Sequence, residues 1–340
     1  NMIENELKKL GLEVWRDEIG HLCNSNGYNV HAFLSGIGEP ILFNAHLDTA
    51  SPGKNIVPVI ENGIIKPSGK TILGGDDKAG IAAVMEALET HIENGIAHRP
   101  IEVFFSIREE SGMLGSQHAD YSKMRSKEAL VLDGDVNACI VNQVAGIIQL
   151  HIEIFGKGAH FALCPENGID ALKAAIAVVN RILMGFMDSN DSVINIYNFT
   201  IPGESNMVPE YASFFIELRC FTTELIKTRK DYIENAVHEG CKLVPGISYK
   251  IEQIFSHDVL FVEQDNTLLL RLRDVCQSIG EPFKLVRTFA SSDAANLVKN
   301  GITAVDYGIG MTNVHTTEEI FAVKDLERTG IIVERMMDTV

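Results

Sequence analysis

The chain has 340 residues, of which 46% are hydrophobic, and its formal net charge is −17. This length favours about two domains with a sizeable core, and the acidic charge argues against nucleic-acid or anionic-membrane partners, which attract basic patches. No apolar run approaches the roughly 20 residues of a membrane span, and the charged, helix-like first ten residues do not resemble a signal peptide. Six scattered cysteines without a C-x-x-C spacing predict reduced thiols in a cytoplasmic protein.

Strand-like and helix-like patterns alternate over residues 1–144. Residues 41–46, 101–107 and 129–132 form short apolar runs that predict buried strands, and residues 76–91 carry apolar side chains at helical spacing after a glycine-rich entry. This alternation predicts an α/β fold with a mostly parallel sheet that is covered on both faces.

The order of elements changes over residues 145–259. The pattern predicts strand, helix, strand, strand, helix and strand, at 147–155, 168–185, 193–200, 210–221, 223–243 and 248–255. This βαββαβ order is the ferredoxin-like α+β arrangement. A helix at 266–279 and a buried strand at 303–310 follow, so we predict one discontinuous α/β domain, 1–144 and 260–340, with the α+β module inserted at 145–259.

Five residues with metal-binding side chains stand at the ends of strands or at the start of the long helix. They are two imidazoles and three carboxylates, a set that suits Zn, Co or Mn. Five ligands are too many for one catalytic zinc, but they fit two ions if one carboxylate bridges. The candidate ligands are His46, Asp76, Glu110, Asp133 and His315.

Two neighbouring carboxylates predict supporting roles. Asp48 lies two residues after His46 and on the same side of an extended segment, where it can orient the imidazole. Glu109 precedes Glu110 at a strand end and can serve as the general base for an attacking water. Each short motif taken alone is more often a solvated loop or helix-cap feature, so the prediction depends on their joint placement.

The chain resembles the co-catalytic zinc metallopeptidases that include peptidase T, glutamate carboxypeptidase, succinyl-diaminopimelate desuccinylase and aminoacylase, and it is most similar to the peptidase T-like members. The resemblance runs from about residue 40 to the end. Its motifs are F-N-A-H-L-D-T-A at 43–50, T-I-L-G-G-D-D-K-A-G-I-A at 71–82, R-E-E-S-G-M-L-G-S at 108–116, L-D-G-D at 132–135, G-K-G-A-H-F-A at 156–162, S-N-M-V-P-E-Y-A at 205–212 and T-N-V-H-T-T-E-E at 312–319.

The resemblance implies a role for each candidate ligand. His46 and Asp133 would bind one zinc, His315 and Glu110 the other, and Asp76 would bridge the two ions. Asp77 follows Asp76 through a cis peptide in many relatives. Asp48 would orient His46, and Glu109 would accept a proton from water and return it to the leaving amine.

The same resemblance implies roles inside the inserted module, which would act as a lid and dimerisation domain. His160 matches an oxyanion-stabilising histidine that often comes from the partner subunit, Arg219 an arginine that grips a substrate carboxylate, and Asn206 a substrate-contacting asparagine. From the residues alone, His160 reads as an exposed loop residue, Arg219 as half of a surface ion pair and Asn206 as a turn residue.

Where the family has a glycine-rich G-G-[ST]-D loop, this chain has F-A-S-S-D at 289–293. That loop lines the substrate pocket in relatives, so Ser292 is a candidate substrate contact and the preferred substrate is expected to differ. Most relatives also begin about thirty residues earlier.

The implied function is a di-zinc aminopeptidase for short peptides, tripeptides above all, with Co²⁺ or Mn²⁺ as alternative metals. A carboxypeptidase or N-acyl amino acid amidohydrolase on the same scaffold is the alternative, and a non-catalytic metal- or peptide-binding protein is a third reading. The resemblance also raises the prospect of a homodimer formed through the inserted module.

Overall fold

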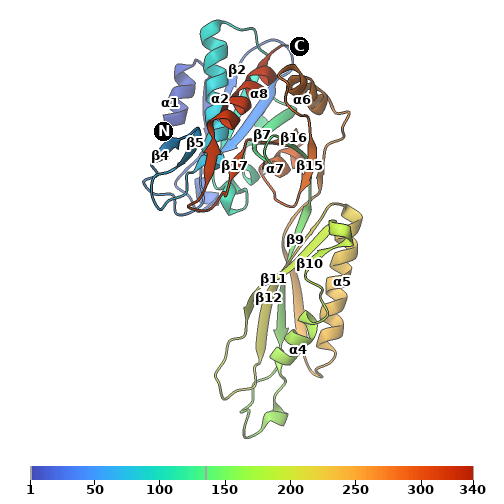
Figure 1. Ribbon diagram of the computed structural model, residues 1–340. Helices are drawn as coiled ribbons and strands as arrows, with labels where there is room; N and C mark the ends of the chain where they lie inside the picture. Colours follow the sequence, from blue (N-terminus) through green and yellow to red (C-terminus); the bar gives the residue numbers. More distant parts are fainter. Residues whose placement is uncertain (1, 135, 340) are drawn as a thin grey trace. The chain divides into compact units, whose positions relative to one another are not determined.

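The computed structural model describes residues 2–134 and 136–339 (Figure 1). The chain divides into two compact units. Unit 1 comprises residues 1–143 and 261–340, and unit 2 comprises residues 144–260. Each of these bounds lies one residue from the boundary expected from the sequence.

The core of unit 1 is a sheet of nine strands. Its strands follow the order β1-β2-β6-β3-β7-β16-β8-β14, and β15 pairs with β8. The four strands β6, β3, β7 and β16 pair in parallel, whereas β1 with β2, β2 with β6, and β16 with β8 are antiparallel. The predicted mostly parallel sheet is therefore confirmed at its centre. The bounds are β1 (Glu13–Asp17), β2 (Asn29–Leu34), β3 (Ile41–His46), β6 (Ile101–Ser106), β7 (Glu128–Gly134), β8 (Ile140–Val144), β14 (Leu260–Phe261), β15 (Leu285–Thr288) and β16 (Thr303–Gly308).

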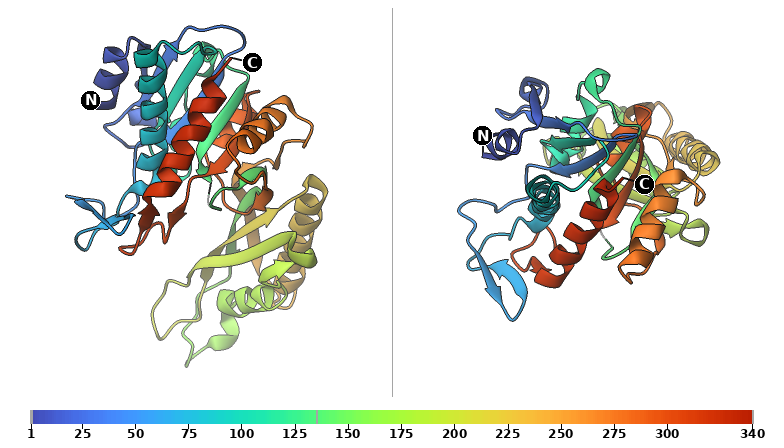
Figure 2. Two further views of the ribbon diagram at one scale, coloured as in Figure 1. Left: turned by 45° about the horizontal axis from the view of Figure 1, so that its top comes forward. Right: turned by 90° about the horizontal axis from the view of Figure 1, so that it is seen from above.

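Helices cover this sheet, and every residue of β3 and β6 is buried. Helix α2 packs on β3 and β7, and α8 lies alongside α2, as the view from above shows (Figure 2). Helix α7 packs on β7 and β16. Burial on both faces explains why the central strands are continuous apolar runs. The helices of unit 1 include α1 (Met2–Lys9), α2 (Gly75–Asn94), α3 (Leu114–Gln117), α6 (Thr267–Ser278), α7 (Ala294–Lys299), α8 (Val323–Met337) and the 3₁₀ turns η1 (Gly20–Leu22), η2 (Glu109–Ser111) and η3 (Tyr121–Lys123).

A small antiparallel sheet of four short strands also belongs to unit 1. Its order is β17-β18-β5-β4. The loop between β17 and β18 carries His315, whose φ of 64° lies in the left-handed region. The bounds are β4 (Pro58–Glu61), β5 (Ile64–Pro67), β17 (Met311–Thr312) and β18 (Ile320–Ala322).

Unit 2 confirms the predicted ferredoxin-like module. Its sheet has the order β10-β11-β12-β9-β13, with antiparallel pairing throughout, and α4 and α5 pack against β9 and β12 over an apolar core. Helix α4 is shorter than the predicted 168–185, because Asp170 caps its start by accepting from Lys173 N and it ends at Asn180. The bounds are β9 (Gly146–Phe155), η4 (Pro165–Asn167), α4 (Ala171–Val179), β10 (Gly185–Met187), η5 (Asp188–Asn190), β11 (Ser192–Thr200), β12 (Tyr211–Cys220), α5 (Thr223–Cys241) and β13 (Ser248–His257).

None of the helices in the described part of the chain is both long enough and apolar enough to cross a membrane.

Candidate metal centre

The carboxyl edge of the parallel strands gathers the candidate ligands of unit 1. His46 is the last residue of β3, and Glu109 and Glu110 open the 3₁₀ turn η2 that follows β6. Asn44 pairs with Val131 in the β3–β7 ladder, so two residues further on His46 lies beside Asp133. Parallel strands end at one edge of a sheet, and this edge is where open α/β folds place their sites.

Asp76 lies between two imidazoles. Its Oδ1 is 2.8 Å from His46 Nε2, and its Oδ2 is 3.0 Å from His315 Nε2. Asp76 stands in the first turn of α2, and its peptide bond to Asp77 is cis. One carboxylate that offers a different oxygen to each of two histidines has the arrangement of a bridging ligand.

The two remaining ligand candidates each lie near one of the two histidines that contact Asp76. Glu110 Oε2 lies 2.9 Å from His315 Nε2, and Asp133 Oδ1 lies 4.0 Å from His46 Nε2. Two ligand atoms on one tetrahedral zinc, each about 2.1 Å from it, are about 3.4 Å apart. The observed spacings bracket that value, so small side-chain adjustments suffice to hold ions.

Two overlapping sets of three donors could each hold an ion, with all donor atoms within 4.8 Å of one another. One set is His46, Asp76 and Glu110, and the other is His46, Glu109 and Asp133. Glu109 therefore lies within reach of a metal position as well as of a proton-transfer position, a dual placement that the sequence did not suggest.

The electrostatics of the cluster favour cations. Burial raises the pKa of Asp133, of Asp77 and of Glu110, and the neighbouring carboxylates add to the effect. Glu110 Oε1 is buried and has no hydrogen-bond partner among the described residues. Crowded carboxylates and an unpaired buried oxygen fit a site that divalent cations would neutralise.

Asp48 links His46 to Glu109. The Nδ1 atom of His46 lies 3.1 Å from the backbone oxygen of Asp48 and 3.6 Å from its carboxylate. That carboxylate accepts a hydrogen bond of 3.0 Å from Glu109 N. The backbone oxygen is thus the nearer partner of the ring, and the carboxylate holds the turn that carries Glu109.

Two buried carboxylates that the sequence did not single out support the cluster. Glu319 accepts hydrogen bonds from the backbone N–H groups of Leu73, Gly74 and Asp76, at 2.8, 2.9 and 3.1 Å. It therefore holds the glycine-rich entry of α2 in place. Its position four residues after His315, in the T-T-E-E segment, was the available signal.

Asp293 is the second of these carboxylates. Its side chain accepts hydrogen bonds from the hydroxyls of Ser106 and Ser116 and from the amide of Asn44, at 3.3 Å for the amide. Ser292, the neighbouring candidate substrate contact, is buried and donates its hydroxyl to Asp306 at 2.5 Å. This geometry turns Ser292 toward the protein interior.

The three candidates in unit 2 fall into two groups. His160 and Asn206 lie on adjacent segments, since Phe161 N donates to Asn206 O at 3.0 Å. Arg219 lies near the far end of β12 and pairs with Glu217 at 2.7 Å. The eight residue-to-residue steps from Tyr211 to Arg219 span about 27 Å of strand, so unit 2 does not bring Arg219 to the other two.

Comparison with known proteins gives consistent results. Residues 42–339 match the family model described as peptidase family M20/M25/M40. The Bacillus subtilis protein YqjE is 28% identical over 348 residues, covering 99% of this chain and 91% of that protein. Peptidase T of Salmonella arizonae is 27% identical, covering 99% of this chain and 90% of its own.

The solved structures include close matches in fold. The aminopeptidase PepT of Bacillus cereus has a TM-score of 0.90 at 27% identity, covering 99% of this chain and 91% of that chain. A tripeptidase of Staphylococcus aureus has a TM-score of 0.92 at 24% identity, covering 99% and 90%, which shows a shared fold.

Proposed function

The chain belongs to peptidase family M20/M25/M40, a family of metal-dependent peptidases, and from this premise we propose that it is a peptidase T-like aminopeptidase acting on tripeptides and other short peptides. The main support for the proposal is the position of Asp76, whose two carboxylate oxygens lie close to two different imidazoles. The names of the relatives supply the substrate class.

We propose that the cluster binds two divalent ions, with Zn²⁺ as first choice and Co²⁺ or Mn²⁺ as alternatives. His46 and Asp133 would hold one ion, His315 and Glu110 the other, and Asp76 both. Bound divalent ions polarise a peptide carbonyl and lower the pKa of water toward neutrality.

Glu109 is the proposed general base and acid. Burial, followed by the nearby charge of Asp293, raises the pKa of Glu109 to about 9. That value leaves the carboxyl protonated at neutral pH when no metal is bound. The charge of bound divalent ions would lower the pKa toward neutrality, where the carboxylate can accept a proton from water and deliver it to the leaving amine later in the reaction. Asp48 would position this residue through the hydrogen bond to its backbone N–H.

His160, Asn206 and Arg219 are the proposed substrate contacts of unit 2. His160 would donate an N–H to the developing oxyanion, a type of contact whose removal costs about 2.7–4 kcal/mol elsewhere. Arg219 lies about 27 Å along β12 from Tyr211, the end of the strand that follows Asn206 in the chain, and a short peptide cannot span that distance. This separation supports a homodimer, in which one copy supplies Arg219 and its partner supplies His160 and Asn206.

The alternative activity is a carboxypeptidase or N-acyl amino acid amidohydrolase that holds a free carboxylate with Arg219. Glu217 already pairs with that guanidinium, which favours the aminopeptidase. A cytoplasmic location is also proposed, because all six cysteines are unpaired thiols, as expected in a reducing compartment.

The test is digestion of a di- and tripeptide panel by protein loaded with zinc, cobalt or manganese, with identification of the products. Each peptide is supplied free, with a blocked amine and with a blocked carboxylate. The proposal expects cleavage that requires the free amine. Equal cleavage of amine-blocked peptides would contradict the aminopeptidase and favour the carboxypeptidase or amidohydrolase. If no products form with any of the metals, the protein would instead be a non-catalytic metal- or peptide-binding protein. Sedimentation of the loaded full chain tests the dimer, which a purely monomeric species would exclude.

A further inference from the structure

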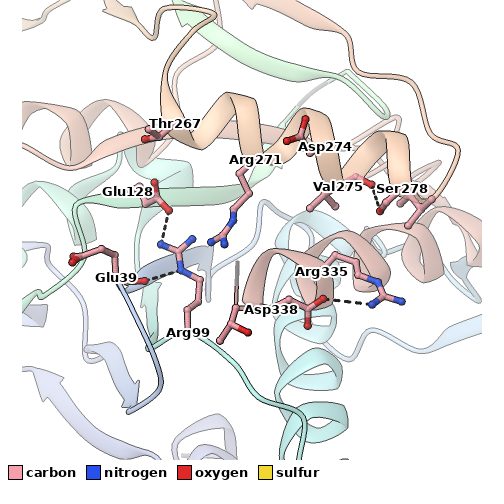
Figure 3. Close-up of a pocket in the computed structure, with 12 residues that line it drawn as sticks. Glu39, Arg99, Glu128, Thr267, Arg271, Asp274, Val275, Ser278, Arg335 and Asp338 are labelled. Carbon is pink, nitrogen blue, oxygen red and sulfur yellow. Dashed lines mark hydrogen bonds and ion pairs between the residues drawn. The ribbon is translucent and has the colours of Figure 1, made fainter.

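A cavity of about 820 Å³ lies in unit 1, and Figure 3 shows the residues that line it. Arg99 and Glu128 line it from the amino ends of β6 and β7, Arg271 from α6 and Asp338 from the segment after α8. The metal cluster lies beyond the carboxyl ends of the same strands, about 17 Å or more away along β6. This cavity therefore has no part in the proposed hydrolysis.

Arg99 is held firmly but keeps one free donor group. The residue is 5% exposed, its Nε donates to the backbone oxygen of Glu39 at 2.7 Å, and its Nη2 pairs with Glu128 at 2.6 Å. Its Nη1 is buried and has no hydrogen-bond partner among the residues that the structure describes. An unpaired buried guanidinium nitrogen costs free energy that a ligand oxygen could recover.

Arg271 points into the same space. Figure 3 shows its guanidinium group descending from α6 toward Arg99. Burial and the like charge of Arg99 lower the pKa of the Arg271 guanidinium, and within the described chain it makes no hydrogen bond or ion pair. Two guanidinium groups that share a cavity repel each other, and a ligand carboxylate between them would reduce this repulsion further than Glu128 and Asp338 do.

Four carboxylates line the cavity, and in the part of the chain that the structure describes none of them forms an ion pair with Arg271. Glu128 is paired with Arg99, and Asp338 lies 3.2 Å from His91 Nε2 and 3.4 Å from Arg335. Asp274 is exposed and pairs with Arg273 at 3.1 Å. Glu39 lines the cavity with an exposed carboxylate, so Arg271 is a guanidinium without a salt bridge rather than an excess charge. The nearby carboxylates would repel an anion with a second charge.

We propose that this cavity binds a small organic monocarboxylate, whose carboxylate group lies between Arg99 Nη1 and the guanidinium of Arg271. Its apolar part contacts Val275 and Ile279, half-buried residues of α6 and its C-terminal end that line the cavity. Guanidinium groups match a planar carboxylate through paired hydrogen bonds. The site is separate from the substrate site of the proposed peptidase.

The probe is 3-methylbutanoate, titrated calorimetrically into the metal-loaded full chain. Its neutral isostere 3-methylbutanamide and inorganic phosphate are titrated in parallel. Arg271→Gln removes the guanidinium that has no ion pair, and Arg181→Gln, an exposed arginine of unit 2 whose Nη1 donates to the backbone oxygen of Ala177, is the matched control. All of these variants keep the metal cluster, so carboxylate binding there should be the same in each. A difference in binding between the variants therefore reports on the cavity.

We expect a binding event in the wild type and in Arg181→Gln that is at least about tenfold weaker in Arg271→Gln. The amide should show no such event, and a crystal soaked in 3-methylbutanoate should show the carboxylate between the two guanidinium groups. Identical isotherms for wild type and Arg271→Gln, equal binding of the amide, or tighter binding of phosphate would each overturn the proposal.

Discussion

Glu109 and Glu110 are adjacent carboxylates with different surroundings. Glu110 lies 2.9 Å from His315, whereas the backbone of Glu109 is held by Asp48. We expect Glu109→Ala to lower kcat by at least about 10³-fold while the bound metal stays unchanged. Glu110→Ala is the comparison, and it should lose metal. If Glu109→Ala loses an ion as well, elemental analysis will have identified Glu109 as a ligand.

Glu319 supports Asp76 without facing the ligands. The substitution Glu319→Gln places a side-chain amide N–H group next to backbone N–H donors. We therefore expect the free energy of unfolding to fall by about 1–3 kcal/mol. Metal affinity should fall about 10–100-fold, because Asp76 loses its anchored amide. Urea unfolding and metal titration measure both effects. The neighbouring Glu318→Gln is the control, and an equal loss there would argue against the anchoring role.

Asp17 and His31 form a buried pair, 2.7 Å apart, in which the His31 ring stacks between Trp15 and Phe104. Burial alone would raise the pKa of Asp17, but the hydrogen bond from His31 and its charge outweigh burial and lower it. A carboxylate with a lowered folded-state pKa stabilises the protein above its unfolded-state pKa of about 3.9, and this stabilisation is lost as pH falls through the folded-state pKa.

We therefore expect Asp17→Asn to lower the free energy of unfolding by about 1–3 kcal/mol at pH 7. The difference from the wild type should shrink as the pH falls below 4, because the wild-type carboxyl then becomes protonated. Urea unfolding from pH 7 to pH 3 measures the two curves. The exposed Asp265→Asn serves as control, and curves that stay parallel throughout would refute the linkage.

For single residues, the sequence was sufficient where a functional side chain follows an apolar strand, because the end of such a strand appears as a change from apolar to polar residues. His46 and Glu110 were found in this way and Asp76 from the start of a helical pattern, and the structure brings the three together. Glu319 and Asp293 act through hydrogen bonds to residues distant in the chain, which no local pattern contains. The inward turn of Ser292 depends likewise on its contact with Asp306.

Among the elements, the central strands of unit 1 and the long helix α2 were predicted, whereas several short elements and the 15-residue helix α8 were not. Strand β3 ends at the predicted residue, and α2 extends only a few residues beyond its predicted bounds. Strands β17 and β18 have two and three residues, too few to show a period of two. Helix α7 was also missed, since six residues barely exceed one turn.

Two helical glycines test how tightly these elements pack. A Cβ at Gly80 of α2 would lie 2.5 Å from Asp77 Oδ1 and 2.9 Å from Leu132 Cβ. At Gly330 of α8 a Cβ would meet nothing within 4 Å. We expect Gly80→Ala to destabilise the protein by about 1–3 kcal/mol, and Gly330→Ala to stabilise it by about 0.5–1 kcal/mol. Thermal and urea unfolding measure both changes, and similar effects at the two sites would contradict the packing described for α2.

For the whole molecule, unit 2 has what an independently folding domain needs. Its apolar core is drawn from residues of unit 2 alone, and its first and last long strands are paired, with Ile147 opposite His257. We expect the fragment 144–260 to fold and to unfold cooperatively in urea, as followed by circular dichroism. Ile216→Asp, which buries a charge in that core, is the control and should abolish the transition. A gradual, non-cooperative change in the unsubstituted fragment would count against its independence.

The pairing of β9 with β13 bears on how unit 1 assembles. Its central sheet joins β7 to β16, strands that stand on opposite sides of the insertion in the chain. Closing a flexible loop of that length costs conformational entropy, but a folded insertion presents its two ends side by side, as a hairpin does. Early folding of unit 2 would thus convert a remote pairing into a nearly local one, so the insertion would speed the completion of the sheet that it interrupts.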